Sequence, residues 1–539
     1  MWRPLKEPVF RALWIAAFVS NIGSLMQEVG SAWLMTSLTR EPLMVALLAT
    51  ATNVPYFLLT VLAGTFADVI DRRSLLIVGQ IWMAVAALIL GVLTVMGMTN
   101  VWSLLALTLF LGFGAAITGP AWNAMIPELV PREQLEEAIA LGSVGYNTAR
   151  GLGSALGGLL VAASGPGCVF LFNGFSFIGV IAVLFNYKPK ADLGASVDRS
   201  GERIITAMKA GLRFARHSAS LRAVFIKTFI WANSVSAMWA LLPLIARERL
   251  QLDSVQYGLL LGAFGAGTLA GAAMMPRLRQ TFSLEISARI GFCVWALFQA
   301  LLGFPINFSL AALYMVALGA AWVVVNSCLN AGTQLSVPSW VRGRALGIYI
   351  LIFQGSIATG SALWGWMGNH TGITMPLFGG SMLLMLGLLA GSRYTLGTVE
   401  QMDTTLSNHW KDPTVINEPG PNDGPVMITV EYIIDPAKGA GFIEALKKLG
   451  VQRKRDGAFQ WHVYSDLSKP SRYVENFVVE NWGEHVRQHE RVMNADRAAE
   501  LSVDGFHIGM KPPIVRHWIS AFAIHTADTP EGEPLREIM

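Results

Sequence analysis

The chain has 539 residues, of which 53% are apolar and only 14% are charged, and its mean hydropathy is +0.48. Soluble globular proteins carry about 25% charged residues, so this composition excludes an ordinary soluble chain and predicts that much of it faces lipid. The net charge of +4 is too small to indicate nucleic acid as a partner. The three cysteines are scattered among apolar segments and form neither a metal-binding spacing nor a disulfide framework.

Apolar runs of membrane-spanning length recur along the chain as far as Arg393. A run of about 20 apolar residues crosses the roughly 30 Å of hydrocarbon in a bilayer. We therefore expect an all-α membrane protein with twelve transmembrane helices in two pseudo-symmetric halves of six. The expected helices cover residues 10–38, 43–67, 74–97, 101–125, 134–163 and 166–186, and then 220–246, 254–276, 285–304, 308–334, 343–367 and 373–394. The first run is itself long enough to span, so no cleavable signal is expected.

The apolar runs and the stretches between them divide the chain into five parts. These are a six-helix half at 1–186, a basic linker at 187–219, a second six-helix half at 220–394, a flexible linker at 395–425 and a soluble domain at 426–539. Within the basic linker, residues 203–217 have apolar side chains at helical spacing. This spacing predicts either an amphipathic helix on the membrane surface or a solvated connection.

Lysine and arginine lie mostly in connections on one side of the predicted membrane. With twelve spans, the N-terminus, the even-numbered connections and the central linker hold eighteen of these residues, whereas the opposite connections hold three, Arg40, Arg247 and Arg249. Positive residues concentrate in the cytoplasmic connections of membrane proteins. We therefore expect both termini in the cytoplasm.

The two halves are related by an internal repeat with a shift of 207 residues. Residues 153–156 read Gly-Ser-Ala-Leu, as do residues 360–363, and Asn123-Ala124 falls on Asn330-Ala331 in the same register. Scattered matches of small residues arise easily in apolar sequence, but a four-residue identity with aligned turn residues does not. Parallel repeats of six spans are how some secondary transporters are built, so the repeat supports the two halves.

The last part of the chain alternates between strand and helix patterns. Strand patterns cover residues 426–434, 458–464, 473–482 and 515–522, and helical patterns cover 437–449 and 484–501. This β-α-β-β-α-β order predicts a small cytoplasmic ferredoxin-like α+β domain. His485 and His489 share a helix face at i, i+4, which is one feature of zinc-binding helices. No third ligand is evident in the sequence, so we interpret the pair as a surface or dimer-interface feature and expect no metal.

A charged turn separates the second and third apolar runs. Each charge would cost about 3 kcal/mol in hydrocarbon, so the turn must lie at a membrane surface. It contains Gly64, Asp68, Asp71, Arg72 and Arg73. This Gly-x-x-x-Asp-x-x-x-Arg-Arg pattern resembles the signature between helices 2 and 3 of the major facilitator superfamily of secondary transporters.

The resemblance implies that this turn acts as a cytoplasmic gate. In the family, the aspartate at the place of Asp68 helps to latch helices 2 and 11, and Arg344 is the candidate guanidinium partner. The alternative is a polar turn that only marks the cytoplasmic side. The chain departs from the family at Asp71, where Gly is frequent, and Met275 stands where the repeat would place a second acid. The latch is therefore expected mainly from the first half.

Small residues in the fifth run form a second element that resembles the superfamily. Residues 153–158 read Gly-Ser-Ala-Leu-Gly-Gly and resemble the Gly-Pro-x-x-Gly-Gly element of its exporters. Ser154 replaces the proline, which weakens the inference of an antiporter. Small residues allow helices to approach closely. The glycines expected to act in helix packing, from this element and its repeat, are Gly153, Gly157, Gly158, Gly360 and Gly365.

Polar residues within the apolar runs are candidates for proton coupling or for the substrate cavity. Glu28 is the first candidate for proton coupling, because a carboxyl withdrawn from water can take up a proton; the alternative is a solvated position near the outer end of its helix. Arg150 is either functional or close enough to the cytoplasmic end to reach the surface. The remaining candidates, each alternatively a helix–helix hydrogen bond, are Gln27, Asn53, Asn123, Asn147, Asn330 and Gln354. Thr108 stands where many proton-coupled relatives carry an arginine, so their proton pathway is not transferred to this chain.

Further stretches narrow the resemblance. Trp33-Leu34, residues 67–73, residues 127–132 and residues 153–158 resemble the bacterial exporter group that includes enterobactin exporters, also described as transmembrane secretion effectors. The C-terminal domain resembles antibiotic-biosynthesis-monooxygenase domains, which usually pair as dimers. A dimer through this domain is therefore expected.

The resemblance implies a secondary active transporter of the bacterial cytoplasmic (inner) membrane, without a cofactor and not an enzyme. It would export a small molecule, such as a drug-like compound, a siderophore or a metabolite, by alternating access with proton coupling. The sequence contains no ATP-binding glycine loop, so the energy is expected from an ion gradient or from the substrate's own gradient. Two alternatives stay open: import of a small solute on the same fold, and a membrane-anchored monooxygenase-like enzyme acting through the C-terminal domain.

Overall fold

The computed structural model describes residues 2–69, 71–187, 204–390 and 418–521, together with residues 403, 405, 407, 410 and 415. The side chains of residues 60–69, 204–210, 490 and 495 lie outside this description. The chain divides into two compact units. Residues 1–199, 223–332 and 346–397 make up the first unit, and residues 200–222, 333–345 and 398–539 make up the second.

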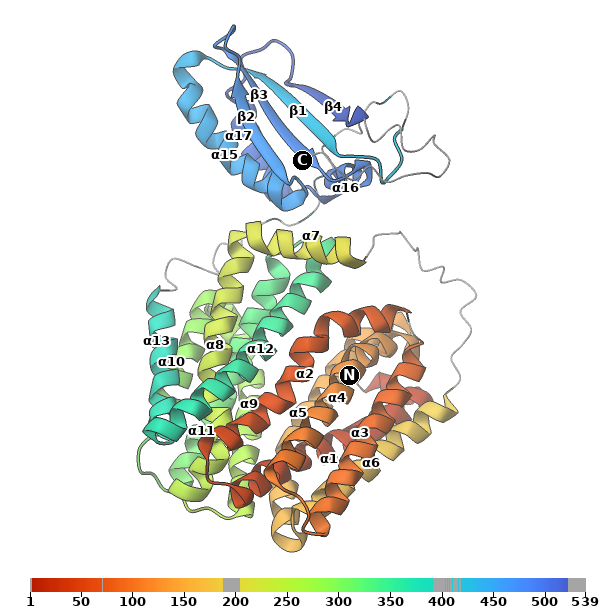
Figure 1. Cartoon of the computed structure of the whole chain (residues 1–539), viewed down its shortest axis with the longest axis vertical. Coiled ribbons are helices and arrows are strands. Elements are labelled where there is room, and N and C mark those ends of the chain that lie inside the picture. Colours follow the sequence, from red (N-terminus) through yellow and green to blue (C-terminus); the bar gives the residue numbers. More distant parts are fainter. Residues whose placement is uncertain are drawn as a thin grey trace, which may run out of the picture. The chain divides into compact units, whose positions relative to one another are not determined.

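Long helices follow the predicted apolar runs to within a few residues (Figure 1). They are α1 (Pro8–Leu38), α2 (Pro42–Val69), α3 (Arg72–Val95), α4 (Val101–Leu129), α5 (Leu135–Ser164), α6 (Pro166–Asn186), α8 (Ala219–Leu244), α9 (Ser254–Thr281), α10 (Leu284–Leu301), α11 (Phe308–Leu335), α12 (Ser339–Thr371) and α13 (Met375–Ala390). Within the described residues, ten helices are long and apolar enough to cross a membrane. Neither α5 nor the shorter apolar helix α13 is among those ten.

Local sequence signals set where these helices begin. Pro8 and Pro166 occupy first-turn positions, where a missing backbone N–H leaves no helical bond unmade. Asn100 and Asp253 form capping boxes at the starts of α4 and α9, and each accepts a hydrogen bond from the N–H three residues on. Gly165, between α5 and α6, has a φ of +79°, a backbone region that favours glycine.

The helices form two groups that correspond to the predicted halves. α1 packs against α5 and α6, α2 against α4, and α3 against α4 and α6. In Figure 1 these red to gold helices lie beside the yellow to teal helices of residues 219–390. Within the second group α10 packs on α13, and α5 lies against α9 across the two groups. The α5–α9 contact is therefore a place where the halves meet.

The second unit contains a four-stranded antiparallel sheet. Its strands are β1 (Val426–Ile433), β2 (Gln460–Ser465), β3 (Arg472–Val479) and β4 (Ile514–Ile519), in the order β2-β3-β1-β4. Alternate residues of β1 are buried and form a core with the apolar side chains of α15 (Gly439–Asp456). β4 therefore lies at one edge, hydrogen-bonded to β1 alone among the described strands.

The prediction of a single helix over residues 484–501 is wrong. The structure has two helices there, α16 (Trp482–Arg491) and α17 (Asn494–Asp504). Val492 has an extended conformation, with φ −65° and ψ 128°. Val492 and Met493 are both buried, so the chain leaves the helix where two adjacent apolar side chains must enter the core.

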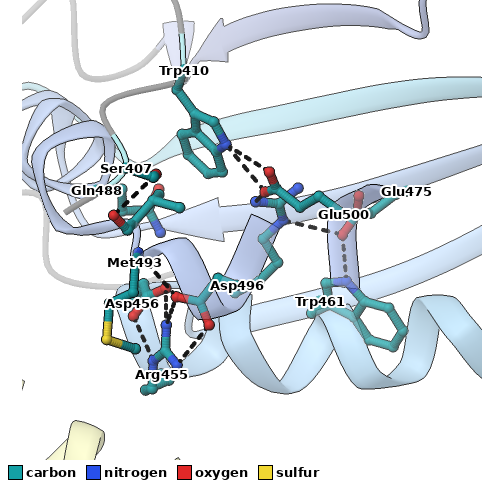
Figure 2. A network of polar contacts seen from close by, with 12 residues as sticks. Ser407, Trp410, Arg455, Asp456, Trp461, Glu475, Gln488, Met493, Asp496 and Glu500 are labelled. Atoms are coloured by element: carbon teal, nitrogen blue, oxygen red, sulfur yellow. Dashed lines mark hydrogen bonds and ion pairs between the residues drawn. The ribbon is translucent and has the colours of Figure 1, made fainter. Parts of the chain in front are cut away.

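A network of buried charges joins α15 to α17 (Figure 2). The Arg455 guanidinium contacts two carboxylates, with Nη2 2.8 Å from Asp456 Oδ2 and 2.5 Å from Asp496 Oδ2. Arg453 donates to Glu500 Oε1 over 2.9 Å. Removing one partner from a buried ion pair is strongly destabilising, so this network fixes the relative positions of the two helices.

Part of the segment 395–425, expected as a flexible linker, is attached to this domain at its described residues. The Ser407 N–H donates to Val492 O over 2.9 Å, and the Asn494 N–H donates to Thr405 O over 2.9 Å. Trp410 Nε1 donates to the Glu500 carboxylate over 3.1 Å (Figure 2). Residues that precede the first strand in the sequence therefore already form hydrogen bonds with the domain.

Glu431 bridges three strands of the sheet. It lies on β1 and accepts hydrogen bonds from Arg472 on β3 over 2.9 Å and from Arg516 on β4 over 3.2 Å. The hydrogen bond from Arg472, with the charges of both arginines, lowers the pKa of Glu431 below its ordinary value. The edge strand β4 is thus held by an ionised carboxylate as well as by its ladder.

The expected helix within the basic linker exists and is α7 (Ile204–His217). Its Arg213 forms an ion pair with Glu484 of α16, and its buried Phe214 lies 5.2 Å from the Arg455 guanidinium. Burial opposes ionisation of Glu484, but the charges of Arg491 and Arg213 lower its pKa below the ordinary value. The described face of α7 therefore packs on the C-terminal domain, which neither sequence alternative foresaw.

Candidate functional site

The two arginines of the charged turn join the start of α3 to the ends of two other helices. Arg72 donates to Ala124 O of α4 over 3.1 Å and forms an ion pair with Glu128. Arg73 donates to two backbone carbonyls in the last turn of α6, at 2.7 and 2.9 Å. Helix C-terminal carbonyls lack intrahelical donors and carry partial negative charge. Arg73 satisfies two such carbonyls at the end of α6, and the two arginines hold one end of the first helix group together.

Asp71 has a local role that explains its departure from the family pattern. Its Oδ2 accepts hydrogen bonds from the Ser74 N–H over 2.9 Å and from the Ser74 hydroxyl over 2.6 Å, which caps the start of α3. Gly64 and Asp68 belong to α2, but their side chains lie outside the described residues, so the latch stays a prediction. Arg344 lies beside Gly211 and 6.0 Å from the Trp340 ring, measured from its guanidinium carbon.

The glycines of α5 serve two different faces. A Cβ added to Gly153 would lie 2.9 Å from Ile22 O, and one added to Gly157 would lie 2.8 Å from Met26 Cα, both on α1. A Cβ on Gly158 would instead lie 2.9 Å from Gly258 Cα on α9. Distances under 3.0 Å to backbone atoms mean that no larger residue fits without moving a helix. The fifth helix is thus packed closely within its own group and across to the other.

The repeat glycines make corresponding contacts. A Cβ added to Gly360 would lie 2.9 Å from Asn233 Oδ1 on α8, the repeat counterpart of α1. A Cβ on Gly365 would lie 3.1 Å from Leu43 Cα on α2, the counterpart of α9. Thr50 also donates to Ala358 O over 2.9 Å between α2 and α12. Two pairs, α5 with α9 and α2 with α12, therefore connect the helix groups.

Glu28 of α1 and Arg150 of α5 lie within electrostatic range of each other. The two charges interact electrostatically, and Tyr257 of α9 also interacts with Glu28. Arg150 Nη2 donates to the Tyr146 hydroxyl over 3.1 Å, and its guanidinium carbon lies 5.3 Å from the centre of that ring. A carboxylate and a guanidinium are thus brought together inside the helical bundle, close to the contact between the groups.

A cavity of about 60 Å³ has Tyr146, the hydrogen-bond partner of Arg150, in its lining. It lies among α1, α4 and α5 and is lined mainly by apolar side chains, including Phe18 and Trp122, with Asn21 and Tyr146 as polar members. Tyr146 therefore connects the lining of the cavity to Arg150 through one hydrogen bond. The cavity is large enough for water but small for an organic substrate.

Some of the other polar candidates form hydrogen bonds within or between helices, and the rest are exposed or half-buried. Gln27 Oε1 accepts from Asn173 Nδ2 over 2.6 Å, which joins α1 to α6. Asn53 and Asn147 each donate to the backbone carbonyl four residues before, over 2.8 and 2.9 Å. Asn123 is exposed, and Asn330 and Gln354 are half-buried. Gln27 thus acts in helix packing, as the sequence alternative allowed.

Sequence reasoning missed a buried ion pair in the second helix group. Lys227 of α8 pairs with Glu285 of α10, and both residues are about 7% exposed. Arg289, one turn further on α10, donates to the same carboxylate over 2.7 Å. Glu285 stands at the start of an apolar run. A charged residue at such a place indicates the end of a helix, so the sequence gives no sign that its side chain is buried. Only the tertiary structure brings Lys227 to it.

An aromatic cluster in the same group was also missed. The half-buried Trp322 of α11 has ring centroids of four other helices within about 6 Å. They belong to Trp231 and Trp239 of α8, Phe264 of α9, Trp295 of α10 and Phe353 of α12. The indole Nε1 of Trp239 is buried and has no acceptor among the described residues. The sequence signal was the tryptophan content of this half, which periodicity alone cannot assign to a common site.

One end of the bundle carries further contacts between the groups. Arg247 donates to the buried Thr36 of α1 over 3.1 Å, and its guanidinium carbon lies 5.2 Å from the Trp33 ring. The Trp33 ring in turn stacks on Tyr257 of α9 at 5.9 Å. These residues lie at the helix ends opposite to the Arg72–Arg73 turn, because α1 runs from Pro8 to Leu38 and α2 returns to that turn.

The C-terminal histidines form a larger group than the sequence indicated. His485 and His489 are joined by His517 of β4, and the ring nitrogens of the three lie within 4.8 Å of one another. The structure thus places a third imidazole, which was not evident from the sequence, beside the pair. Burial, then the neighbouring His489 and His517, lower the pKa of His485 to about 3, so this ring is neutral at neutral pH. The missed signal was the Val-x-His-x-Ile alternation of residues 515–519.

Comparison with known proteins identifies the family. The model of the family described as transmembrane secretion effector matches residues 1–525. The chain belongs to this family. Relatives of this secretion effector include the enterobactin exporter EntS of Salmonella choleraesuis, 24% identical over 405 residues that cover 72% of this chain and 95% of that protein. The multidrug efflux pump Tap of Mycolicibacterium fortuitum is 22% identical over 388 residues, covering 70% and 93%.

Solved structures agree with this assignment at the level of the fold. A bacterial homolog of the human lysosomal transporter Spinster, inward-facing and occupied, has a TM-score of 0.57 and 13% identity over 73% of this chain and 98% of that chain. A bacterial homologue of the iron transporter ferroportin, inward-facing, has a TM-score of 0.57 and 14% identity over 72% and 98%. The expected transporter fold is confirmed, and the secretion effector belongs with transporters and not with enzymes.

Proposed function

We propose that this secretion effector exports a small molecule from the cytoplasm by alternating access, with protons as the driving ion. The observation that carries the proposal is the family match over residues 1–525. Relatives that align with about 70% of this chain are named as an enterobactin exporter and a multidrug efflux pump. The substrate class that follows is a drug-like compound, a siderophore or a metabolite. Alternating access moves two halves about a site near the middle of the membrane.

The proposed membrane arrangement has twelve spans, α1–α6 and α8–α13. It counts α5, which is 30 residues long, and the shorter α13, because the 207-residue repeat pairs α5 with α12 and α6 with α13. The distribution of basic residues supports a cytoplasmic N-terminus and C-terminus in the inner membrane. With that orientation, the contacts at Thr36 and Arg247 lie on the outer side, which favours an inward-facing state.

For the proton we propose Glu28, with Arg150 as its electrostatic partner. An ionised Glu28 attracts Arg150, and protonation removes that attraction while the Arg150–Tyr146 hydrogen bond of 3.1 Å can persist. Because Tyr257 of α9 also interacts with Glu28, the change of charge is felt at the contact between the groups. Proton uptake would thus bias the packing of α5 against α9, which is what coupling requires.

For the substrate we propose the aromatic cluster around Trp322 as one wall of the binding site. Ligand sites combine apolar and aromatic walls with a few polar groups. The buried Trp239 Nε1, which has no acceptor among the described residues, is a donor that a substrate oxygen could satisfy. Asn123, Asn330 and Gln354 remain proposed cavity residues, and the Asp68–Arg344 latch remains the proposed cytoplasmic gate.

The C-terminal domain is proposed as a cytoplasmic ferredoxin-like module that pairs with a second copy. The strand order β2-β3-β1-β4, with antiparallel neighbours throughout, supports the β-α-β-β-α-β arrangement. The proposed domain plan keeps halves at 1–186 and 220–394 and the module at 426–539, with linkers at 187–219 and 395–425.

Export is tested in cells that lack their own efflux systems. Cells expressing the wild type or Glu28→Gln are loaded with a panel of fluorescent compounds and followed after addition of glucose. We expect the wild type to lower the retained amount of at least one compound and the variant to do so much more slowly. Accumulation of such a compound only from the outside, in cells expressing the wild type, would contradict export and favour import.

A further inference from the structure

Three histidines meet between α16 and β4 of the C-terminal domain. His485 and His489 are one turn apart on α16, and His517 lies on β4. His517 is opposite Ile428 of β1 in the antiparallel ladder, so its side chain shares a face of the sheet with that buried residue. The half-buried imidazole thus lies on the face of β4 that is turned toward the core, two residues from the half-buried Ile519.

One edge of this group already has the spacing of a metal site. His485 Nε2 and His489 Nε2 are 3.3 Å apart. Two nitrogens bound to one tetrahedral zinc ion at about 2.0–2.1 Å lie roughly 3.3 Å from each other. His517 is within 4.8 Å of both. Because it is half-buried and on an edge strand, a side-chain rotation can shorten the remaining distances without repacking the core.

The surroundings orient the ring of His485. Gln488 Oε1 accepts a hydrogen bond from His485 Nδ1 over 3.3 Å, which leaves the lone pair on Nε2. Such outer hydrogen bonds fix the tautomer of metal-binding histidines. The lone pair of His485 faces His489 Nε2, and an ion between them uses both lone pairs once His489 carries its proton on Nδ1.

Aromatic rings cover the group. The Trp482 ring lies 5.5 Å from the His485 ring and 6.3 Å from the His517 ring. Trp410 meets His489 edge to face at 5.0 Å. An apolar shell of this kind limits the access of water to bound ions and favours their retention.

We propose that His485, His489 and His517 bind one divalent transition-metal ion, with zinc as the first choice. Imidazole nitrogens suit zinc, copper and nickel, whereas calcium and magnesium require oxygen ligands. Three histidines with one position left for water or a small ligand is the donor set of open zinc sites. The bound ion joins the edge strand β4 to α16. This metal site does not depend on which substrate is transported.

The test uses the full chain in detergent, purified through a tag without histidines. The protein is stripped with a chelator, incubated with zinc sulfate, separated from free ion and analysed for zinc by mass spectrometry. Cobalt is then used as a spectroscopic probe, because a tetrahedral cobalt site absorbs intensely in the visible range. We expect one zinc per chain, a tetrahedral cobalt spectrum and a higher thermal unfolding temperature with zinc than without it.

The decisive variants are His489→Asn and His517→Asn, since both side chains are half-buried and their replacement leaves the core intact. His485 is buried, so its replacement is expected to disturb folding and carries less weight. His462→Asn is the matched control, because His462 is an exposed histidine on β2. Loss of zinc in both decisive variants with full retention in the control supports the site. A wild type that retains no more zinc than His489→Asn, or a His517→Asn variant with undiminished zinc and an unchanged cobalt spectrum, overturns it.

Discussion

Replacing Gly158 by alanine should loosen the contact between α5 and α9. A Cβ at this position lies 2.9 Å from Gly258 Cα and closer still to Ser254 O. Both are backbone atoms, so the helices must separate, since no flexible side chain can yield. Gly151 lies two turns earlier on the same helix, and among the described residues no atom lies within 4 Å of its added Cβ. Gly151→Ala is therefore the matched control.

The size of the effect follows from the close packing. Overpacking of a well-packed contact costs about 1–3 kcal/mol. This cost falls on the state in which α5 and α9 touch at Gly158, and a state that is open at this end escapes it. The equilibrium between the two states should then shift by roughly 5- to 150-fold.

Labelling of a cysteine at position 36 measures the shift. Thr36 is buried at the same end of the bundle and accepts a hydrogen bond from Arg247. In a chain whose three native cysteines are replaced by serine, we expect Thr36→Cys to react faster with a maleimide when Gly158→Ala is also present. Gly258→Ala should act in the same way, because its Cβ lies 2.9 Å from Gly158 Cα.

The control decides whether the reasoning holds. Gly151→Ala should leave the labelling rate at position 36 unchanged, because it adds a methyl group without a clash. Equal rates in Gly158→Ala and Gly151→Ala would refute the view that close α5–α9 packing closes this end.

Three further predictions concern charged residues. Glu28→Gln should abolish substrate transport driven by a pH gradient in inverted vesicles while preserving the amount of folded protein, and undiminished transport would remove Glu28 from the mechanism. Lys227→Met should lower stability by about 3 kcal/mol, because it removes one of the two cations that contact the buried Glu285 carboxylate. A double variant, Lys227→Met with Glu285→Met, should recover most of the loss in detergent unfolding, and an unchanged single variant would speak against the pair. Glu431 has a lowered folded pKa, so its contribution is present above the unfolded value of about 4.3 and is lost as the pH falls through the folded value. The stability difference between wild type and Glu431→Gln should therefore shrink as the pH falls below about 4.3, and a constant difference would contradict this.

The positions of the helices can be predicted from the sequence, because a membrane-length helix is determined by the residues within it and at its ends. A run of apolar residues between turn signals determines a membrane-length helix wherever its neighbours lie, and α6 has the predicted bounds, residues 166–186. The packing role of Gly158 was also predictable, because a small residue repeated on one helix face has few other uses. That its contact partner is Gly258 required the structure.

Long-range partners could not be predicted from local patterns. Lys227 and Glu285 are separated by most of two helices, and the carboxylate sits where a helix boundary is expected. His517 lies on a strand far along the chain from His485, and one histidine within a short alternating segment gives a weak signal. The break between α16 and α17 depends on the burial of Val492 and Met493, which helical spacing alone does not reveal.

The most direct test of the central claim is transport by the purified chain in liposomes of known orientation. A fluorescent compound identified in the efflux panel is supplied on the cytoplasmic face of the protein. The solution on the opposite, outer face is made more acidic, so that protons tend to move toward the cytoplasmic face. The account predicts accumulation of the compound against its gradient on the outer side, collapse of this accumulation by a protonophore, and its loss in Glu28→Gln. Movement that occurs only down the compound's own gradient, with no response to pH, would contradict proton-coupled export.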